Sequence, residues 1–339
     1  MTEEKPRLVD HEEQLPAGER GAVRRGALVV SLDFELTWGV RHAGRRVDAD
    51  GARRAVDALL SVFASEGIAA TWATVGFLFA ADRAERERFA PRLRPSYHDG
   101  ALSPYAHPTG PDETRDPSHF ALSLLREVQR TPGQEVGSHT HSHFFTRAPG
   151  QQRDQFAADL DSARRIATQA GFDVRALVFP KNQVNEAYLD LLPAYGFTSY
   201  RGAQRGWRHR GDALPQRAAR LWQSHAGRAG EFTAPWSAVC RPAPSAAVNV
   251  PGTAFLRPAS PSTPLLNGAR VRRLRAGLRD AARRGRVLHL WWHPHNFAAH
   301  LAENLAALGA VLQTVHELRD AGRLDSLTMT EAAERGAAC

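Results

Sequence analysis

Hydrophobic and polar positions along this chain follow two alternating periods. Short apolar runs rich in Val, Leu and Phe, typical of buried strands, are separated by longer stretches with apolar residues at helical spacing. The runs that predict strands are residues 27–34, 68–75, 135–138, 175–180, 197–200, 286–292 and 326–329. The stretches that predict helices are residues 51–65, 118–129, 151–170, 186–195, 269–284 and 301–318. Repeated β–α units predict an α/β fold with a parallel sheet, whose strands carry functional residues at their carboxyl ends.

Two segments depart from this pattern. Residues 1–26 are polar, and we expect them to be disordered. Residues 201–267 lose periodicity and become rich in Pro, Gly and Arg. A connection this long is more often a functional insertion than a linker, and this one includes Trp207, Trp222 and Trp236. We therefore expect one domain, residues 27–339, with an irregular insertion at about 201–267 that forms a wall or lid beside the site.

The composition is that of an ordinary globular protein. Of 339 residues, 42% are hydrophobic and 24% are charged, and no apolar run approaches the roughly 18 residues that a membrane helix needs. The polar N-terminus lacks the apolar core of a signal peptide. Two cysteines, Cys240 and Cys339, give no disulfide framework. A cytoplasmic location is the expectation.

The net charge of +8 comes almost entirely from Arg, which gathers at residues 201–228 and 270–286. The second cluster predicts a helix with Val271, Leu274 and Leu278 along its apolar stripe, so a solvated face is the favoured interpretation. Attraction of an anionic glycan is the alternative. Nucleic acid is not an expected partner, because no known motif interleaves these arginines with stacking aromatics.

The first strand ends in two carboxylates, Asp33 and Glu35, which share one face if the chain stays extended. Carboxylates ending an apolar strand need water, a cation or a proton to be tolerated. The pair alone therefore favours a role in a functional site no more than the alternative, in which one carboxylate caps a turn and the other is solvated.

Three histidines, His139, His141 and His143, follow the third strand. The spacing of His139 and His143 is i, i+4, which on a helical turn places both imidazoles on one side, suited to a single metal ion. A chance cluster in a chain with 15 His, or a capping loop, is the alternative. One carboxylate and two histidines would leave open positions on the ion, as hydrolysis requires.

Two further strand ends carry polar residues. Lys181 follows the fourth strand and is the only lysine besides Lys5, while Asn182 beside it is as well explained as a helix cap. His293 and His295 follow the predicted strand at residues 286–292, at the carboxyl ends of the strands, where a general acid is needed. Trp291 and Trp292 precede them, and because strand neighbours alternate, we expect one in the core and one free to stack on a sugar ring.

Taken in order, SLDFE, HTHSH, the polar turn after VFP, and HLWWHPH resemble the polysaccharide deacetylase superfamily, that is carbohydrate esterase family four with its chitooligosaccharide deacetylase-like members. The similarity is greatest to the subgroup found with surface-polysaccharide genes and spans residues 27–329. It implies a distorted (β/α) barrel of about seven parallel strands and a catalytic domain at residues 27–339.

The resemblance also implies roles for individual residues. Asp33 matches the general base, His139 and His143 match the two metal-binding histidines, and His293 matches the general acid, with His295 in reserve. The candidates for substrate contact are Trp38, Asn182, Trp291 and Trp292.

The chain departs from the family pattern at two positions. Most members have adjacent aspartates, the second of which binds the metal; here that position is Phe34, so Glu35 becomes the carboxylate ligand. The third motif usually begins with an Arg that holds the base. This chain has Phe179-Pro180-Lys181 instead, and Lys181 is the candidate substitute.

The implied activity is metal-dependent removal of an acetyl group, first of all from an amide nitrogen on a sugar or a surface-polysaccharide precursor, with Zn²⁺ as the first choice of metal for N/O ligands. Two alternatives remain: an allantoinase-like hydrolase of a small cyclic amide, and a non-catalytic glycan-binding relative. A glycosidase using Asp33 and Glu35 is disfavoured, because carboxylates so close lie on one side of the substrate rather than flanking the bond.

Overall fold

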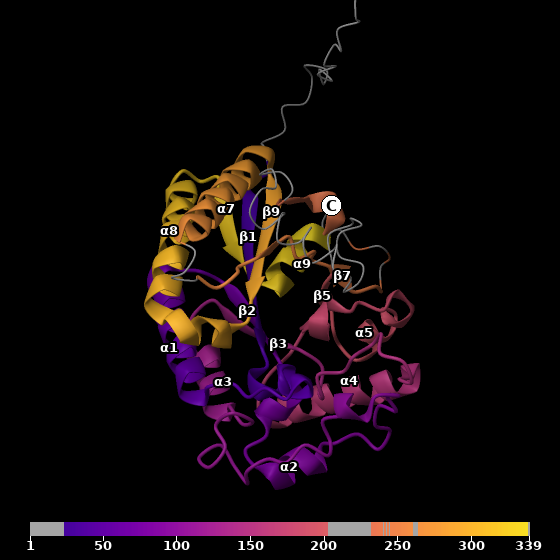
Figure 1. The fold of residues 1–339 in the computed structure, drawn as a ribbon. Helices are drawn as coiled ribbons and strands as arrows, with labels where there is room; N and C mark the ends of the chain where they lie inside the picture. Colours follow the sequence, from indigo (N-terminus) through magenta and orange to yellow (C-terminus); the bar gives the residue numbers. More distant parts are fainter. Residues whose placement is uncertain are drawn as a thin grey trace, which may run out of the picture.

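The computed structural model describes residues 24–202, 232–239, 241, 243, 245–259 and 264–337. These residues form one curled sheet with helices packed around it (Figure 1). The strands are β1 (Gly26–Phe34), β2 (Ala70–Thr74), β3 (Gln134–Ser138), β4 (Ala176–Val178), β5 (Ser199–Arg201), β6 (Ala234–Pro235), β7 (Val248–Asn249), β8 (Ala254–Phe255), β9 (Arg286–Trp292) and β10 (Leu324–Leu327). The α-helices are α1 (Ala49–Glu66), α2 (Arg83–Arg88), α3 (Leu122–Arg130), α4 (Arg153–Gln169), α5 (Leu191–Ala194), α7 (Pro264–Arg284), α8 (Leu301–Asp320) and α9 (Met329–Ala337).

The sheet has the order β6-β9-β1-β2-β3-β4-β5-β7, with β10 also pairing with β1 and β8 with β9. Every described strand pair is parallel except β6 with β9. The carboxyl ends of the long strands therefore meet at one rim. The predicted α/β class, a distorted (β/α) barrel, is confirmed as a half-barrel, although the described sheet has ten strands where about seven were expected and one of its pairs is antiparallel.

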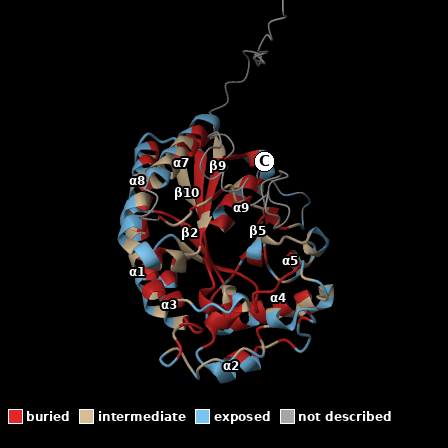
Figure 2. Ribbon diagram, in the orientation of Figure 1, coloured by how far each residue is buried: buried red, intermediate tan, exposed pale blue. Residues whose placement is uncertain are grey.

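The two faces of the sheet have different cores, as β1 illustrates. All nine of its residues are buried. Leu28, Val30 and Leu32 pack in the large cluster between the sheet and the helices. Ala27 and Val29 belong to a smaller cluster inside the curl, which includes residues of β4, β7 and α9. Figure 2 shows the buried residues along the strands and on the helix faces turned toward them. Since side chains alternate, the next inward positions on β1 are Ser31 and Asp33, and polar groups line the rim.

Some elements differ from the prediction. The stretch at 186–195 forms a 3-10 turn, Glu186–Tyr188, and a single helical turn, Leu191–Ala194. Pro193 lacks the N–H that a continuous helix would need there. The expected strand at 326–329 ends at Leu327 and gives way to α9. Thr328 and Glu331 exchange side chain to backbone hydrogen bonds there, a capping box that starts the helix.

The expected insertion lies only partly within the described residues. Residues 203–231, with Trp207 and Trp222, are outside them, as are residues 1–23 and both cysteines. The described part contributes strands β6, β7 and β8 to the sheet. Trp236 is buried against the inner cluster. No helix in the described part of the chain is long and apolar enough to cross a bilayer.

Candidate active site

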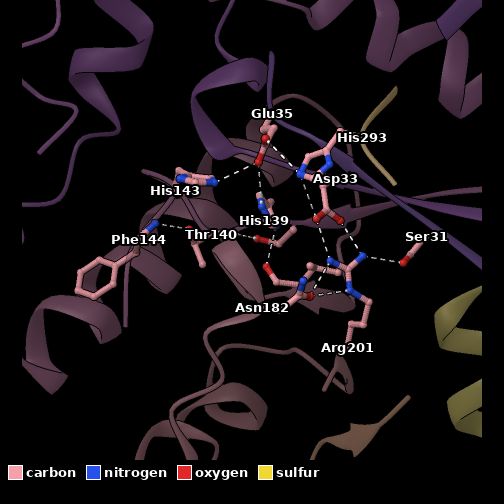
Figure 3. Close-up of polar contacts among 12 residues, drawn as sticks. Ser31, Asp33, Glu35, His139, Thr140, His143, Phe144, Asn182, Arg201 and His293 are labelled. Atoms are coloured by element: carbon pink, nitrogen blue, oxygen red, sulfur yellow. Dashed lines mark hydrogen bonds and ion pairs between the residues drawn. The ribbon is translucent and has the colours of Figure 1, made fainter. Parts of the chain in front are cut away.

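Glu35, His139 and His143 form a buried cluster at the rim (Figure 3). One ligand atom from each lies within 4.8 Å of the other two. Oε2 of Glu35 is 3.1 Å from Nε2 of His143 and 3.3 Å from Nε2 of His139. Among the described residues, this is the one group of three His, Cys, Asp or Glu side chains arranged in this way.

The two histidines come together on a loop and not, as the i, i+4 spacing suggested, on a helical turn. His143 has a φ of +58°, in the left-handed region, and its ring centroid lies 5.1 Å from that of His139. Asp159 of α4 holds this loop by accepting the backbone N–H groups of His141 and Ser142 at 2.7 and 3.1 Å. Sequence reasoning missed Asp159, whose position in the middle of a helix gave no signal.

The cluster has the chemistry of a metal site. Nδ1 of His139 is 2.9 Å from the carbonyl of Val178, which can only accept, so Nδ1 carries the proton. Nε2 of a neutral His139 then directs a lone pair at the Glu35 carboxylate, and it has no hydrogen-bond partner. Two buried electron-rich atoms at this distance are stabilised by a proton or a metal ion between them. Two imidazole nitrogens and one carboxylate oxygen suit Zn²⁺ or a similar divalent ion, so the residues fit the implied metal.

The protonation states agree with this assignment. Burial raises the pKa of Glu35, but His293, His139 and His143 together hold it well below its ordinary value. Burial lowers the pKa of His143 to about 4. At neutral pH the cluster therefore offers an ionised carboxylate and a neutral imidazole, which are the forms that bind metal.

Asp33 lies beside this cluster and is held by Arg201, the last residue of β5. The guanidinium donates to both carboxylate oxygens, at 2.6 and 2.8 Å, and both side chains are buried. Burial raises the pKa of Asp33, but the charge of Arg201, helped by His139 and His293, holds it below its ordinary value. Asp33 is therefore an ionised base within the site.

Arg201, and not Lys181 as expected, is the cation that holds the Asp33 carboxylate. Lys181 is exposed, and its ammonium lies over the ring of Phe145 at 4.6 Å. Sequence reasoning assigned Arg201 to the start of the insertion and so missed its role. The available signal was its position directly after a predicted strand, residues 197–200, since polar residues at strand ends were the other site candidates.

His293 lies at the mouth, within reach of both carboxylates. Its Nε2 is 3.5 Å from Oε1 of Glu35 and 3.7 Å from Oδ2 of Asp33, and a quarter of its side chain is exposed. His295 lies beside it, with ring centroids 5.4 Å apart, and forms no ion pair with either carboxylate in the described structure. Burial, then the charge of His293, lowers the pKa of His295 to about 4. His293 is thus the histidine that a substrate can reach together with the carboxylates.

The candidates for substrate contact separate into two groups. Trp292 and Trp38 are fully buried: Trp292 stacks on Phe297 in the outer core, and the Trp38 indole donates to the carbonyl of His119. Neither can contact a substrate there, so both are corrected to core residues. Trp291 points inward and stays partly exposed, so the two neighbouring tryptophans face opposite ways.

Asn182 is bound to Arg201, with its Oδ1 accepting from Nε and Nη2 at 3.1 and 2.9 Å. Both Lys181 and Asn182 have a φ of +53°. Two successive non-glycine residues in the left-handed region are strained, and such strain gathers at functional sites. The turn after β4 therefore directs Asn182 inward and Lys181 outward.

Comparison with solved structures agrees with the fold described above. A candidate polysaccharide deacetylase from Mycobacterium smegmatis superposes with a TM-score of 0.57 at 14% identity, over 93% of this chain and 91% of that one. A second candidate polysaccharide deacetylase, from Pseudomonas aeruginosa PAO1, gives 0.55 at 12% identity, over 91% and 89%. No family model and no curated protein matches the sequence. The chain has the fold of the polysaccharide deacetylases, as its motifs led us to expect.

Proposed function

We propose that this protein is a metal-dependent deacetylase that hydrolyses an acetyl group, first of all an N-acetyl group, on a sugar or surface-polysaccharide precursor. The observation that carries the proposal is the convergence of a metal-type cluster with a separate, ionised carboxylate and a reachable imidazole. Glu35, His139 and His143 make the cluster, Asp33 is the carboxylate and His293 is the imidazole. A binding protein has no need of the last two.

The residues divide the work of hydrolysis as follows. A divalent ion held by Glu35, His139 and His143, with zinc the first choice, would polarise the acetyl carbonyl and make water more acidic. Asp33 accepts the proton of the attacking water on a carboxylate oxygen, and Arg201 keeps that carboxylate ionised and oriented. His293, open to the mouth, donates a proton to the departing amine nitrogen. The products are acetate and a free amine.

A sugar is the favoured substrate because an aromatic wall lies beside these groups. Trp291 packs against Phe255 with ring centroids 4.6 Å apart, and both rings are partly exposed. The Trp291 ring is also 6.2 Å from that of His293. A partly exposed aromatic surface next to the proton donor suits one face of a pyranose ring.

The test is acetate release by purified protein supplied with Zn²⁺, Co²⁺ or Mn²⁺ in turn. The panel contains N-acetylated oligosaccharides, O-acetylated sugars, nucleotide-linked N-acetyl sugars and the cyclic amide allantoin, for which ring opening is followed. Metal-stimulated release from the N-acetylated sugars supports the proposal. Turnover of allantoin alone, or none with any substrate and metal, contradicts it.

A further inference from the structure

Every N–H group of the Arg201 guanidinium donates a hydrogen bond. It makes five hydrogen bonds: Nε and Nη2 to Asn182, Nη1 and Nη2 to the two oxygens of Asp33, and Nη1 to Oγ of Ser31 at 2.9 Å. A guanidinium has five N–H donors in a rigid fork. Since Arg201 is fully buried, the loss of any one acceptor would leave a charged donor without a partner.

Ser31, two residues before Asp33 on β1, is the acceptor that the mechanism does not use. Arg201 can only donate, so Oγ of Ser31 accepts from it and its own proton points elsewhere. The remaining partner of Oγ is Nε2 of His289, at 2.8 Å. The hydroxyl therefore donates to the imidazole, provided that Nε2 of His289 carries no proton.

His289, on β9, meets that condition. Its Nδ1 is 3.1 Å from the carbonyl of Val250, an acceptor, so Nδ1 holds the ring proton and Nε2 the lone pair. The ring is fully buried and close to the cationic Arg201. A doubly protonated His289 would have an N–H facing the Ser31 hydroxyl and would force it to turn its proton toward Arg201.

The hydrogen bonds thus run in one direction, from Arg201 to Ser31 to His289 to the backbone after β7. They join β1, β5, β7 and β9 on the inner face of the sheet. The flat face of the guanidinium is also covered, because it lies over the Trp291 ring at 4.4 Å. Gly252 packs closely against the aliphatic part of the Arg201 side chain, because a Cβ at residue 252 would lie 3.3 Å from Cδ of Arg201. These contacts confine the stem and one face of Arg201, and its hydrogen bonds fix how the fork is turned.

We infer that Ser31 and His289 are positioning residues, which act through Arg201 to fix the carboxylate of Asp33. The catalytic consequence rests on the proposed function, whereas the hydrogen-bond chain itself does not. Without Ser31 or the acceptor nitrogen of His289, the Arg201 fork rotates away from its two-point contact with Asp33. The base is then misdirected while the metal ligands stay in place.

NMR tests the chain whether or not a substrate has been found. In ¹⁵N-labelled protein, His289 should be the neutral form with its proton on Nδ1, and the Arg201 guanidinium N–H signals should exchange slowly. Ser31→Ala should shift and broaden those signals. Ser199→Ala is the matched control, because Ser199 is buried on the same strand as Arg201 and its hydroxyl has no hydrogen-bond partner in the described structure. A proton on Nε2 of His289, or equal effects of the two variants, overturns the inference.

A double-mutant cycle tests the consequence for turnover. Ser31→Ala should lower kcat roughly tenfold, with KM and metal content nearly unchanged and Ser199→Ala close to wild type. In the Arg201→Met background the same change should cost less than about twofold, because the residue it acts through is gone. His289→Phe should behave like Ser31→Ala, while His289→Gln, which keeps an acceptor, should recover part of the activity. If the losses of activity in the single variants simply add in the double variant, the inference is overturned. If wild-type protein is inactive on every substrate, the result counts against the proposed function, and the NMR experiment alone tests the hydrogen-bond chain.

Discussion

Arg201 of β5 holds both carboxylate oxygens of Asp33 of β1, although three strands, β2, β3 and β4, lie between them in the sheet order. The contact exists because the sheet curls far enough for its inner face to meet itself. The orientation of Asp33, the base of the proposed mechanism, therefore depends on the curvature of the sheet as well as on its place at the end of β1.

Glu35 rather than its neighbour Phe34 should decide metal binding. Glu35→Gln removes the negative charge from the cluster and should weaken Zn²⁺ binding by at least tenfold. Phe34→Leu is the control, because Phe34 packs edge-on against Trp72 in the outer core, away from the cluster. Metal content after dialysis against a graded chelator measures both. Equal metal retention in the two variants would remove Glu35 from the ligand set.

A substitution outside the ligand set should have the same effect. A Cβ on Gly39 would lie 2.0 Å from the carboxylate carbon of Glu35, so Gly39→Ala forces that carboxylate aside. We expect Gly39→Ala to fold but to lose metal affinity by tenfold or more, as measured by zinc titration. Gly44→Ser is the comparison, because no atom lies within 4 Å of a Cβ there, although its φ of +66° costs some stability. If Gly39→Ala binds zinc as well as wild type does, Glu35 does not need the position described here.

The two histidines at the mouth should differ in importance. His293→Gln removes the group that lies within 3.7 Å of both carboxylates and should lower kcat by about 10²-fold without loss of metal. His295→Gln should have a much smaller effect, because in the described structure the ion pairs with Asp33 and Glu35 are made by His293 and not by His295. Steady-state kinetics on the best acetylated substrate compares the two, and the reverse order would transfer the general-acid role to His295.

Buried His289 should make stability depend on pH. Its pKa lies at about 3, mainly because of burial, while that of an unfolded histidine is about 6.5. Below pH 6.5 the unfolded chain takes up a proton that the folded chain refuses, so stability is complete above that pH and falls as the pH drops toward 3. Between pH 6 and pH 5 this one group should account for about 1 kcal/mol of the loss. Urea unfolding at both pH values should show a loss of stability in His289→Phe that is smaller than in wild type by about that amount; an unchanged pH dependence would mean that His289 is not buried in its neutral form.

Much of the site could be predicted from the sequence. Asp33 lies at the end of an apolar run, and Glu35, His139, His143 and His293 follow such runs; in a parallel sheet these positions share one rim. The pattern did not reveal which way the tryptophans face. Trp38 follows Glu35 closely in sequence, but the 3-10 turn after β1 directs its ring into the core.

The supporting network could not be predicted. Ser31 and His289 are single polar residues inside apolar strands, where a sequence offers no sign of a partner. Arg201 is one of many arginines in a chain with 44 Lys and Arg residues, so its type carried no information. Their contacts depend on strand order and curl, which periodicity does not encode. The geometry of His139 and His143 depends likewise on left-handed backbone angles that their spacing does not specify.

The most direct test of the account is a comparison of Asp33→Asn with wild type for metal content and acetate release together. The substitution keeps the shape of the side chain and removes the base. We predict about one zinc-type ion per chain in both proteins and turnover lower by at least about 10²-fold in the variant. Loss of the metal from Asp33→Asn, or turnover close to that of wild type with the metal retained, would contradict the separation of base from ligands on which the proposed function depends.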